Sequence, residues 1–534
     1  MAGAYRRDFF AGGRSPVLAG QAAIATSHAL ATAAGLEILA AGGNAVDAAL
    51  AAVAVQVVVE PHMTGIGGDC FVLYAPAGKA PIALNGSGRA PAAASVAALR
   101  EAGLEGAIPR SSPHAVTVPG AISAWCRLHR DHGSLPMDRL FARAIAYAEN
   151  GYPVAPRVAQ DWAEEVAALQ ADAGAAALYL PQGRAPLPGE RHAQPLLGQR
   201  LREIARDGAA AFYTGRTAES LVGYLRGLGG LHTLDDFAAG LDGADYAEPI
   251  ATAYRGHEVL ECPPNGQGLA ALMILQVLER FDLGPDLPAV DRVHLQAEAT
   301  KLAYHHRDAF LADPAAAPDL AARLLAPAVA ETLARRIDRD KAMAPVLWTE
   351  AEHKDTIYLC AVDRDGNAIS FINSIFSAFG STRVDPGTGI VLHNRGASFR
   401  LIEGHPNAIG PRKRPLHTII PGMLAKGGRI VGPFGVMGGH YQAAGHAALV
   451  SGLLDRGLDV QAALDAPRSF AFDGVLEVEP TLGDDVIAGL GARGHQIKRR
   501  TSPIGGGQAI LIDHERGVLI AGSDPRKDGG AAGF

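Results

Sequence analysis

The chain has 534 residues, of which 48% are hydrophobic and 19% are charged. This composition is typical of a folded globular protein with a large core and excludes a disordered chain. The net charge is -7, and the few Lys/Arg clusters are short. A nucleic-acid partner requires a concentrated basic face, so we expect none.

The four cysteines are far apart in the sequence and form no CxxC pair, which argues against a disulfide framework and a zinc site. The first residues lack the apolar stretch of about 7–15 residues that a secretory signal needs. The longest apolar run, Ala45 to Val59, is shorter than the roughly 20 residues of a membrane span. We therefore expect a cytoplasmic protein without a membrane partner.

Helices dominate the first part of the chain. Ser27 to Ala41 is predicted to be a helix with Ser27 as its N-cap. Asn44 is predicted to cap a second helix, Ala45 to Val58, which is apolar on all sides and must be buried between layers. Further helices are predicted at Gly120–Arg130, Met137–Asn150, Ala159–Ala171, Gln199–Arg206, Thr217–Arg226, Leu269–Phe281, Val293–Leu311 and Pro327–Asp338.

The character of the sequence changes near residue 355. Thr356 to Val362 is rich in β-branched and aromatic residues, and an Asp-Gly turn separates it from a second such run, Ala368 to Phe376. This pattern predicts a β-hairpin. A second hairpin is predicted from Gln508 to Ala521. Strands accompanied by several helices favour a layered α/β core.

A threonine that begins a strand is usually only a β-former, but the surroundings of Thr356 are distinctive. Residues 354–368 resemble the processing site of the gamma-glutamyltransferases, in which a Thr seven residues before the Asp of a V-D-x-D-G-N-A turn becomes a new N-terminus. Here that Asp is Asp363 and the Thr is Thr356. Further matches to the family follow in order along the chain, at 42–49, 64–69, 413–416, 438–439 and 521–526.

The resemblance implies an α+β fold, the four-layer αββα sandwich of the N-terminal nucleophile hydrolases. It implies autocatalytic cleavage between Asp355 and Thr356. The products would be a mostly helical large subunit, 1–355, and a small subunit, 356–534, that remain interleaved. It implies no metal or organic cofactor and leaves open whether the chain forms a homo-oligomer.

The chemistry implied for Thr356 is nucleophilic catalysis. A threonine hydroxyl is a weak nucleophile until a base takes its proton. Cleavage would free an α-amine on the same residue, with a pKa near 8, and this amine can be the base. By resemblance, the adjacent Gly438 and Gly439 would form the oxyanion hole, and Ser374 would hydrogen-bond the nucleophile. Asn373 is a candidate helper, although a regular strand points it to the other face.

The substrate pocket departs from the family pattern. The family's carboxylate-binding Arg falls on Ser87, with Arg89 one strand period later, and the family's ammonium-binding Asp is replaced by Ser398. Arg395 adds a cation, and the family's Ser-Ser pair becomes His417-Thr418. A buried ammonium without a counter-charge is costly, whereas a carboxylate facing Arg is favoured.

These changes predict a small acidic amide without a free α-amino group, of the oxamate or the glutaryl type. Substrate-binding roles are therefore assigned to Arg89, Asn373, Arg395, His417 and Thr418. Three alternatives stay open: a glutathione-degrading gamma-glutamyltransferase, an uncleaved binding homologue, and an Arg395 that is only a surface or structural residue.

Overall fold

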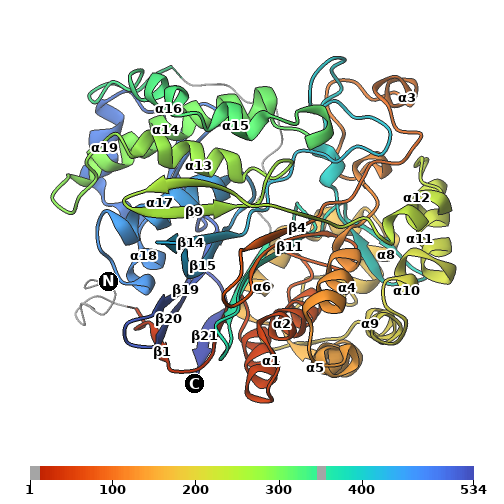
Figure 1. The fold of residues 1–534 in the computed structure, drawn as a ribbon. Coiled ribbons are helices and arrows are strands. Elements are labelled where there is room, and N and C mark those ends of the chain that lie inside the picture. The colour runs from red at the N-terminus through yellow and green to blue at the C-terminus, as the bar shows by residue number, and fades with distance from the viewer. Residues whose placement is uncertain (1–12, 345–355) are drawn as a thin grey trace.

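Two antiparallel sheets form the centre of the molecule in the computed structural model, which describes residues 13–344 and 356–534 (Figure 1). The strand order of the first sheet is β1 (Val17–Ala19), β20 (Val518–Ser523), β19 (Gly506–Asp513), β15 (Arg429–Met437), β14 (Gly422–Lys426), β9 (His257–Glu261) and β8 (Ile250–Tyr254). The order of the second is β21 (Gly530–Gly533), β2 (Ala23–Thr26), β10 (Ile357–Val362), β11 (Ala368–Ser374), β3 (Asp69–Ala75), β4 (Ile82–Gly86) and β7 (Asp245–Ala247).

Both sheets combine strands from before and after Thr356. In the second sheet, β10 lies between β2 and β11, and β11 pairs with β3. In the first sheet, β14 pairs with β9, and β1 pairs with β20. The segment before residue 356 is thus rich in helices and also supplies strands to both sheets. Strands from the two parts are neighbours in each sheet, and main-chain hydrogen bonds join them.

Helices cover the outer faces of the two sheets (Figure 1). The second sheet is covered by α1 (Ala29–Ala40), α2 (Ala45–Val59) and α4 (Ala121–His132), with α5 (Met137–Asn150) packed on α2. The first sheet contacts α13 (Gly268–Leu278), α17 (Gln442–Leu454) and α18 (Val460–Asp465), with α14 (Ala289–Phe310) packed on α13. The inner faces meet where β10 contacts β15 and β19.

The remaining elements surround this centre. The helices are α3 (Val96–Glu101), α6 (Pro156–Glu164), α7 (Val166–Gln170), α8 (Ala173–Tyr179), α9 (Pro195–Asp207), α10 (Ala210–Tyr213), α11 (Gly215–Gly227), α12 (Leu234–Gly240), α15 (Leu320–Leu324), α16 (Pro327–Ala334) and α19 (Asp484–Ala492). The small sheets are β5–β6 (Tyr152–Pro153, Arg191–His192), β12–β13 (Arg383–Asp385, Ile390–Leu392) and β16–β17–β18 (Ser469–Phe472, Val475–Val478, Ile497–Arg499). Each predicted helix falls on a helical stretch, although Ala159–Ala171 is divided between α6 and α7.

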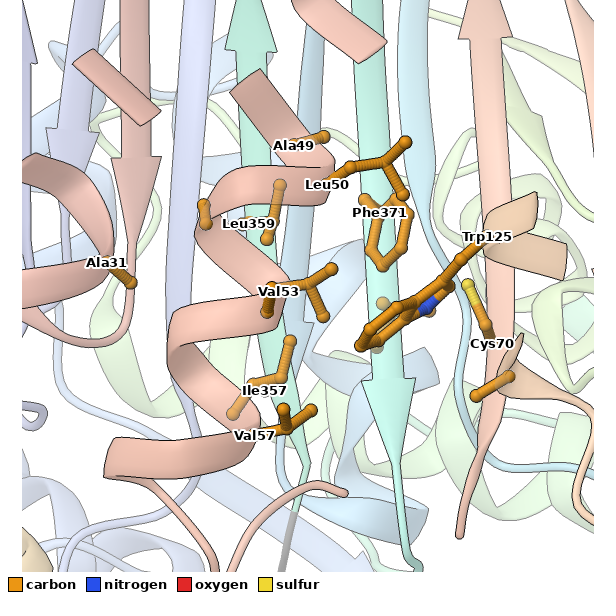
Figure 2. Close-up of a cluster of buried hydrophobic side chains, with 14 of the residues drawn as sticks. Ala31, Ala49, Leu50, Val53, Val57, Cys70, Trp125, Ile357, Leu359 and Phe371 are labelled. Carbon is orange, nitrogen blue, oxygen red and sulfur yellow. The ribbon is translucent and has the colours of Figure 1, made fainter. Parts of the chain in front are cut away.

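Helix α2 fixes the strand that carries Thr356. Asn44 and Asp47 form a capping box at its start, and every residue of the helix is buried, as its uniformly apolar sequence predicts. Its side chains pack against those of β10 and β11, as Figure 2 shows for Val53, Leu359 and Phe371. Because full burial of such a side chain is worth about 1.5–3 kcal/mol, β10 is held in a rigid position.

One predicted cap is wrong. The N-cap of α1 is His28, whose side chain accepts a hydrogen bond from the Leu30 amide at 3.2 Å. Ser27 Oγ instead donates to the buried Glu60 carboxyl group, at 2.7 Å, at the end of α2. A tertiary hydrogen bond therefore overrides the local capping preference of Ser27. The two predicted hairpins are confirmed as β10–β11 and β19–β20.

The four cysteines are free thiols. Among the described residues, no helix combines the length and the apolar character that a membrane span requires.

Candidate active site

Thr356 lies immediately before β10, in the middle of the second sheet. Its side chain is fully buried, and its Oγ1 lies 3.2 Å from the Oγ of Ser374, the last residue of β11. The pairing of Ile357 with Asn373 places Thr356 opposite Ser374 in the antiparallel register. The predicted contact between these two hydroxyls is therefore present. Asp355, on the other side of the predicted cleavage point, lies outside the described residues.

Gly438 and Gly439 form a tight turn at the end of β15. Their φ values of +119° and +58° lie in the left-handed region, which favours glycine. The Gly438 carbonyl accepts a hydrogen bond from the Tyr441 amide at 3.0 Å. This bond fixes the peptide between the two glycines, so the amide of Gly439 points away from the turn. Because neither glycine carries a side chain, the backbone of this turn can be approached closely.

Gln442 connects this turn to the nucleophile. It is the first residue of α17, and its Nε2 donates to Thr356 Oγ1 at 3.4 Å. Its Oε1 accepts from the Ile420 amide at 3.1 Å. The glycine turn, which is separated from Thr356 by many residues in sequence, is therefore held beside it in space.

A second buried amide, Gln267, connects the same turn to the segment that contains Thr418. Its Nε2 donates to the carbonyls of Gly439, at 3.0 Å, and of Thr418, at 2.7 Å. Its Oε1 accepts from the guanidinium of Arg307, at 2.5 Å. Because Arg307 can only donate, the orientation of the Gln267 amide is fixed.

Arg395 occupies the centre of a buried polar pocket. It is 0% exposed, which excludes the interpretation as a surface arginine. Its guanidinium donates to Thr418 Oγ1 at 2.8 Å and to Ser374 Oγ at 3.4 Å, and it lies over the Phe376 ring at 3.8 Å. Its Nε has no hydrogen-bond partner among the described residues. Burial lowers the pKa of Arg395 to about 9, so the group is a cation at neutral pH.

Asp69 is the nearby counter-charge. Its carboxylate accepts hydrogen bonds from the amides of Gly88 and Gly120, at 3.0 and 3.1 Å, and from His417 Nε2, at 3.0 Å. Burial by itself raises the pKa of Asp69, but the neighbouring His393, His417 and Arg395 bring it below its usual value. Asp69 is therefore ionised.

His417 is a neutral imidazole in this pocket. Burial, reinforced by the charge of Arg395, lowers the pKa of His417 to about 3. The Nε2–H donates to Asp69, and Nδ1 accepts from the Ile419 amide at 3.4 Å. His417 thus holds Asp69, while its neighbour Thr418 holds Arg395.

A cavity of about 270 Å³ adjoins the glycine turn. Gly438 lies in its wall together with an aromatic group, in which His440 and Phe470 each stack on Phe472. The rim carries ion pairs such as Arg110–Glu165 and Arg500–Glu477. The glycine turn is therefore accessible from this cavity on the side where Gly438 lies.

Comparisons with known proteins identify the family. The sequence profile of the family described as Gamma-glutamyltranspeptidase matches residues 31–534. The chain belongs to the gamma-glutamyltranspeptidase family. It is 36% identical to the glutathione hydrolase-like YwrD proenzyme of Bacillus subtilis (strain 168), over 96% of this chain and 98% of that protein.

Two further relatives belong to the acylase-like branch of the gamma-glutamyltranspeptidase family. The oxamate amidohydrolase proenzyme of Klebsiella pneumoniae subsp. pneumoniae is 36% identical, over 95% of this chain and 97% of its own. The crystal structure of cephalosporin acylase from Bacillus halodurans superposes with a TM-score of 0.93 at 40% identity, covering 99% of this chain and 98% of the other. The protein is an amidohydrolase of this family with a mixed α/β fold.

Two residues to which the sequence analysis gave substrate-binding roles lie apart from this group. Arg89 has a side chain 41% exposed that forms ion pairs with Asp245, at 3.3 Å, and with Asp313, at 3.7 Å. Asn373 points to the helix-covered face of the second sheet, where it bonds Thr64 Oγ1 at 2.8 Å and accepts from Trp125 Nε1 at 3.1 Å. Neither side chain contacts Thr356, Ser374 or Arg395 through a hydrogen bond among the described residues.

Sequence reasoning missed Gln267, Gln442 and Asp69. Gln442 follows the second glycine of the family motif by three residues, at the start of a helix, and this spacing was the available signal. Asp69 ends the glycine loop that the family resemblance identified, at the start of β3. Nothing in the sequence shows that these residues meet, because their contacts join distant segments.

One buried cluster has the residue types of a metal site. His294, Glu298 and His495 are buried, with one ligand atom from each within 4.8 Å of the others. The two imidazoles already bond each other at 2.8 Å, and the Glu298 oxygens accept from Lys301 Nζ and the Met343 amide. These atoms are thus satisfied within the chain, and the expectation of no metal stays a prediction.

Proposed function

We propose that this chain is an autoprocessing amidohydrolase whose nucleophile is Thr356. The observation that carries the proposal is the position of the Thr356 hydroxyl, 3.2 Å from Ser374 Oγ and linked through Gln442 to the Gly438-Gly439 turn. A nucleophile, its hydrogen-bonding neighbour and an oxyanion turn thereby occupy one buried site at the head of a rigid strand. Under this proposal, Ser374, Gly438 and Gly439 have the roles predicted from the family.

The same hydroxyl would perform maturation and catalysis. In maturation, Oγ of Thr356 attacks the carbonyl carbon of Asp355. The C–N bond breaks as the hydroxyl proton passes to the Thr356 nitrogen, which leaves an ester, and water hydrolyses that ester. The freed α-amine then serves as the base for later attacks on substrate amides. Its pKa near 8 suits proton transfer close to neutral pH. Water resolves the resulting threonyl acyl-enzyme.

The subunits produced would be 1–355 and 356–534, and each would be the other's obligatory partner. This proposal is supported by the alternation of strands from both parts in both sheets. Separation would break the β10–β2 and β14–β9 ladders. The contacts of helices with the outer faces and of β10 with β15 support the four-layer αββα sandwich.

The substrate we propose is the amide of a small acid that lacks a free α-amino group, of the oxamate or glutaryl type. Arg395, with an unpartnered Nε and a charge at neutral pH, can take the acyl carboxylate. Ser398 replaces the family's ammonium-binding Asp and bonds two main-chain carbonyls at 2.7 Å. The nearby carboxylate, Asp69, is already held by His417. An ammonium would therefore enter a site with a cation and without an available counter-charge.

The experiment is a denaturing gel of the purified protein with N-terminal sequencing of the smaller band. We expect two fragments and a small fragment that begins with Thr356, Ile357 and Tyr358. Thr356→Ala should remain a single chain without activity. Hydrolysis of oxamate, a glutaryl amide and glutathione should then be compared. If the Thr356→Ala precursor is still cleaved into subunits, Thr356 is not the nucleophile. If glutathione is hydrolysed faster than oxamate and the glutaryl amide, the proposed substrate class is wrong.

A further inference from the structure

The hydrogen bonds around Ser374 determine where its proton goes. A serine hydroxyl has two acceptor lone pairs and one proton. Ser374 Oγ accepts from the Phe376 amide at 2.9 Å and from Arg395 at 3.4 Å. With both lone pairs engaged, its proton can be donated to Thr356 Oγ1, which lies 3.2 Å away.

Gln442 presents a second donor to the same oxygen. Its side chain is completely buried. The Ile420 amide can only donate, so the amide end of Gln442 that faces it at 3.1 Å is the carbonyl oxygen. The other end, Nε2–H, then faces Thr356 Oγ1 at 3.4 Å. Turning the amide over would place two N–H groups against each other, so this orientation is fixed.

We propose that Gln442 is a further catalytic residue, which donates through Nε2 to the Thr356 hydroxyl oxygen. This inference rests on the proposed role of Thr356 as the nucleophile. Two incoming donors, Ser374 and Gln442, occupy the lone pairs of the neutral hydroxyl. The Thr356 proton is thereby turned toward the remaining side, where the α-amine of the same residue can accept it.

As the proton passes from Oγ to the α-amine, Oγ gains a third lone pair, and this pair forms the bond to the substrate carbonyl carbon. The Gln442 and Ser374 bonds stabilise the negative charge that develops on Oγ during the transfer. When the C–N bond of the substrate breaks, the α-ammonium returns the proton to the leaving amine. Gln442 itself gains and loses no proton, because an amide is not a base at neutral pH.

Two variants distinguish hydrogen-bond donation by Gln442 from a role in which its side chain only fills space. Gln442→Met keeps the approximate volume and removes both polar ends. Gln442→Glu keeps the acceptor for the Ile420 amide and replaces the donor by a second acceptor. Gln461→Met is the matched control, since Gln461 is also a buried amide with hydrogen bonds to Asp465 and Ser523, on α18. All three are compared with wild type for the rate of conversion of precursor to subunits, for kcat and KM, and for melting temperature.

We expect Gln442→Met to lower kcat and the cleavage rate by about tenfold to a hundredfold, with KM within threefold of wild type. Gln442→Glu should lower kcat further at pH 8, because an ionised carboxylate competes for the Thr356 proton and raises the pKa of the α-amine. The acidic limb of its pH–kcat profile should therefore move to higher pH. Gln461→Met should lower the melting temperature and leave kcat and the cleavage rate unchanged.

Two results would overturn the inference. The first is a Gln442→Met protein that matures and turns over at rates within threefold of wild type. The second is a Gln442→Glu protein whose acidic limb coincides with that of wild type while its kcat equals that of Gln442→Met, which indicates a structural role alone. Because precursor cleavage needs no added substrate, the maturation part of the first result can be read even if the substrate class is wrong. Cleavage in Thr356→Ala marks the separate failure of the nucleophile itself.

Discussion

The guanidinium of Arg395 donates to the hydroxyl of Thr418 across 2.8 Å, inside a pocket that is closed to solvent. An arginine held in this way presents its remaining N–H groups in a fixed direction. Its Nε has no partner among the described residues. Under the proposed function, a substrate carboxylate would take that place, and Arg395 and Thr418 would together recognise the acyl group.

Arg395→Lys should impair binding of an acidic acyl group more than the chemical step. Lysine keeps a positive charge but cannot form two parallel hydrogen bonds to a carboxylate. We expect KM for a glutaryl amide to rise about tenfold or more, which corresponds to about 1.4 kcal/mol. The matched control is Arg89→Lys, because the half-exposed Arg89 pairs with Asp245 and Asp313 and lies apart from Arg395. A larger KM effect from Arg89→Lys would instead restore the role that its sequence position suggested.

Gly438→Ala should slow both maturation and turnover. The φ of +119° is unfavourable for alanine, and a Cβ atom there would lie 3.0 Å from the Gly505 Cα. Displacement of one oxyanion donor typically costs about 10²–10³ in kcat. Gly494→Ala is the control, since Gly494 has a φ of +93° and open space around its Cβ position. Equal loss of kcat in the two variants would show that backbone strain, and not the location of Gly438, is responsible.

Much of this site could be predicted because its residues carry local or family signals. The hydrophobic pattern of 45–58 predicted a helix buried on all sides, and the β-branched run after Thr356 predicted the first strand of a β-hairpin. The family resemblance, carried by the spacing from Asp363 to Thr356 and by the two adjacent glycines, indicated the residues to which the proposed function gives the roles of nucleophile and oxyanion turn.

The missed residues differ in kind, because their roles depend on tertiary contacts. Gln442 matters through its distance to Thr356, and Asp69 through the imidazole of His417. The same holds for the N-cap of α1, because Ser27 bonds the buried Glu60 carboxyl group and does not cap the helix. Alternation along β11 did predict that Asn373 faces away from Ser374, and its bonds to Thr64 and Trp125 show that it does.

Asp69→Asn should destabilise the folded protein. Asp69 is a buried carboxylate next to the Arg395 cation, and removal of its charge leaves that cation without its counter-charge. We expect the free energy of unfolding to fall by about 3–5 kcal/mol, measured by urea denaturation at pH 7. Since the folded pKa of Asp69 is depressed, its contribution is complete above the unfolded value of about 3.9 and is lost as the pH falls further. The difference between wild type and variant should therefore narrow under acid conditions; a constant difference would contradict this account.

Glu60→Gln should change how stability depends on pH, with no expected effect on the site itself. Glu60 is buried at the end of α2, where its Oε2 accepts from Ser27 Oγ and Gln56 Nε2. Burial raises the pKa of Glu60 from 4.5 to about 7. Because the folded pKa is the higher one, the protonated group is favoured in the folded state. The contribution of Glu60 to the free energy of unfolding is therefore complete below pH 4.5. It falls as the pH rises toward 7, by about 3 kcal/mol in total.

A glutamine offers the same accepting oxygen to Ser27 without ionising, so this loss should be absent in the variant. Urea unfolding of both proteins at intervals from pH 4.5 to pH 8 measures the difference directly. We expect the free energies of unfolding to converge near pH 4.5 and to separate in favour of Glu60→Gln as the pH rises to 7, with no further separation above it. Parallel curves over this range would mean that Glu60 is already ionised in the folded protein, and that its hydrogen bonds to Ser27 and Gln56 outweigh the cost of burying the charge.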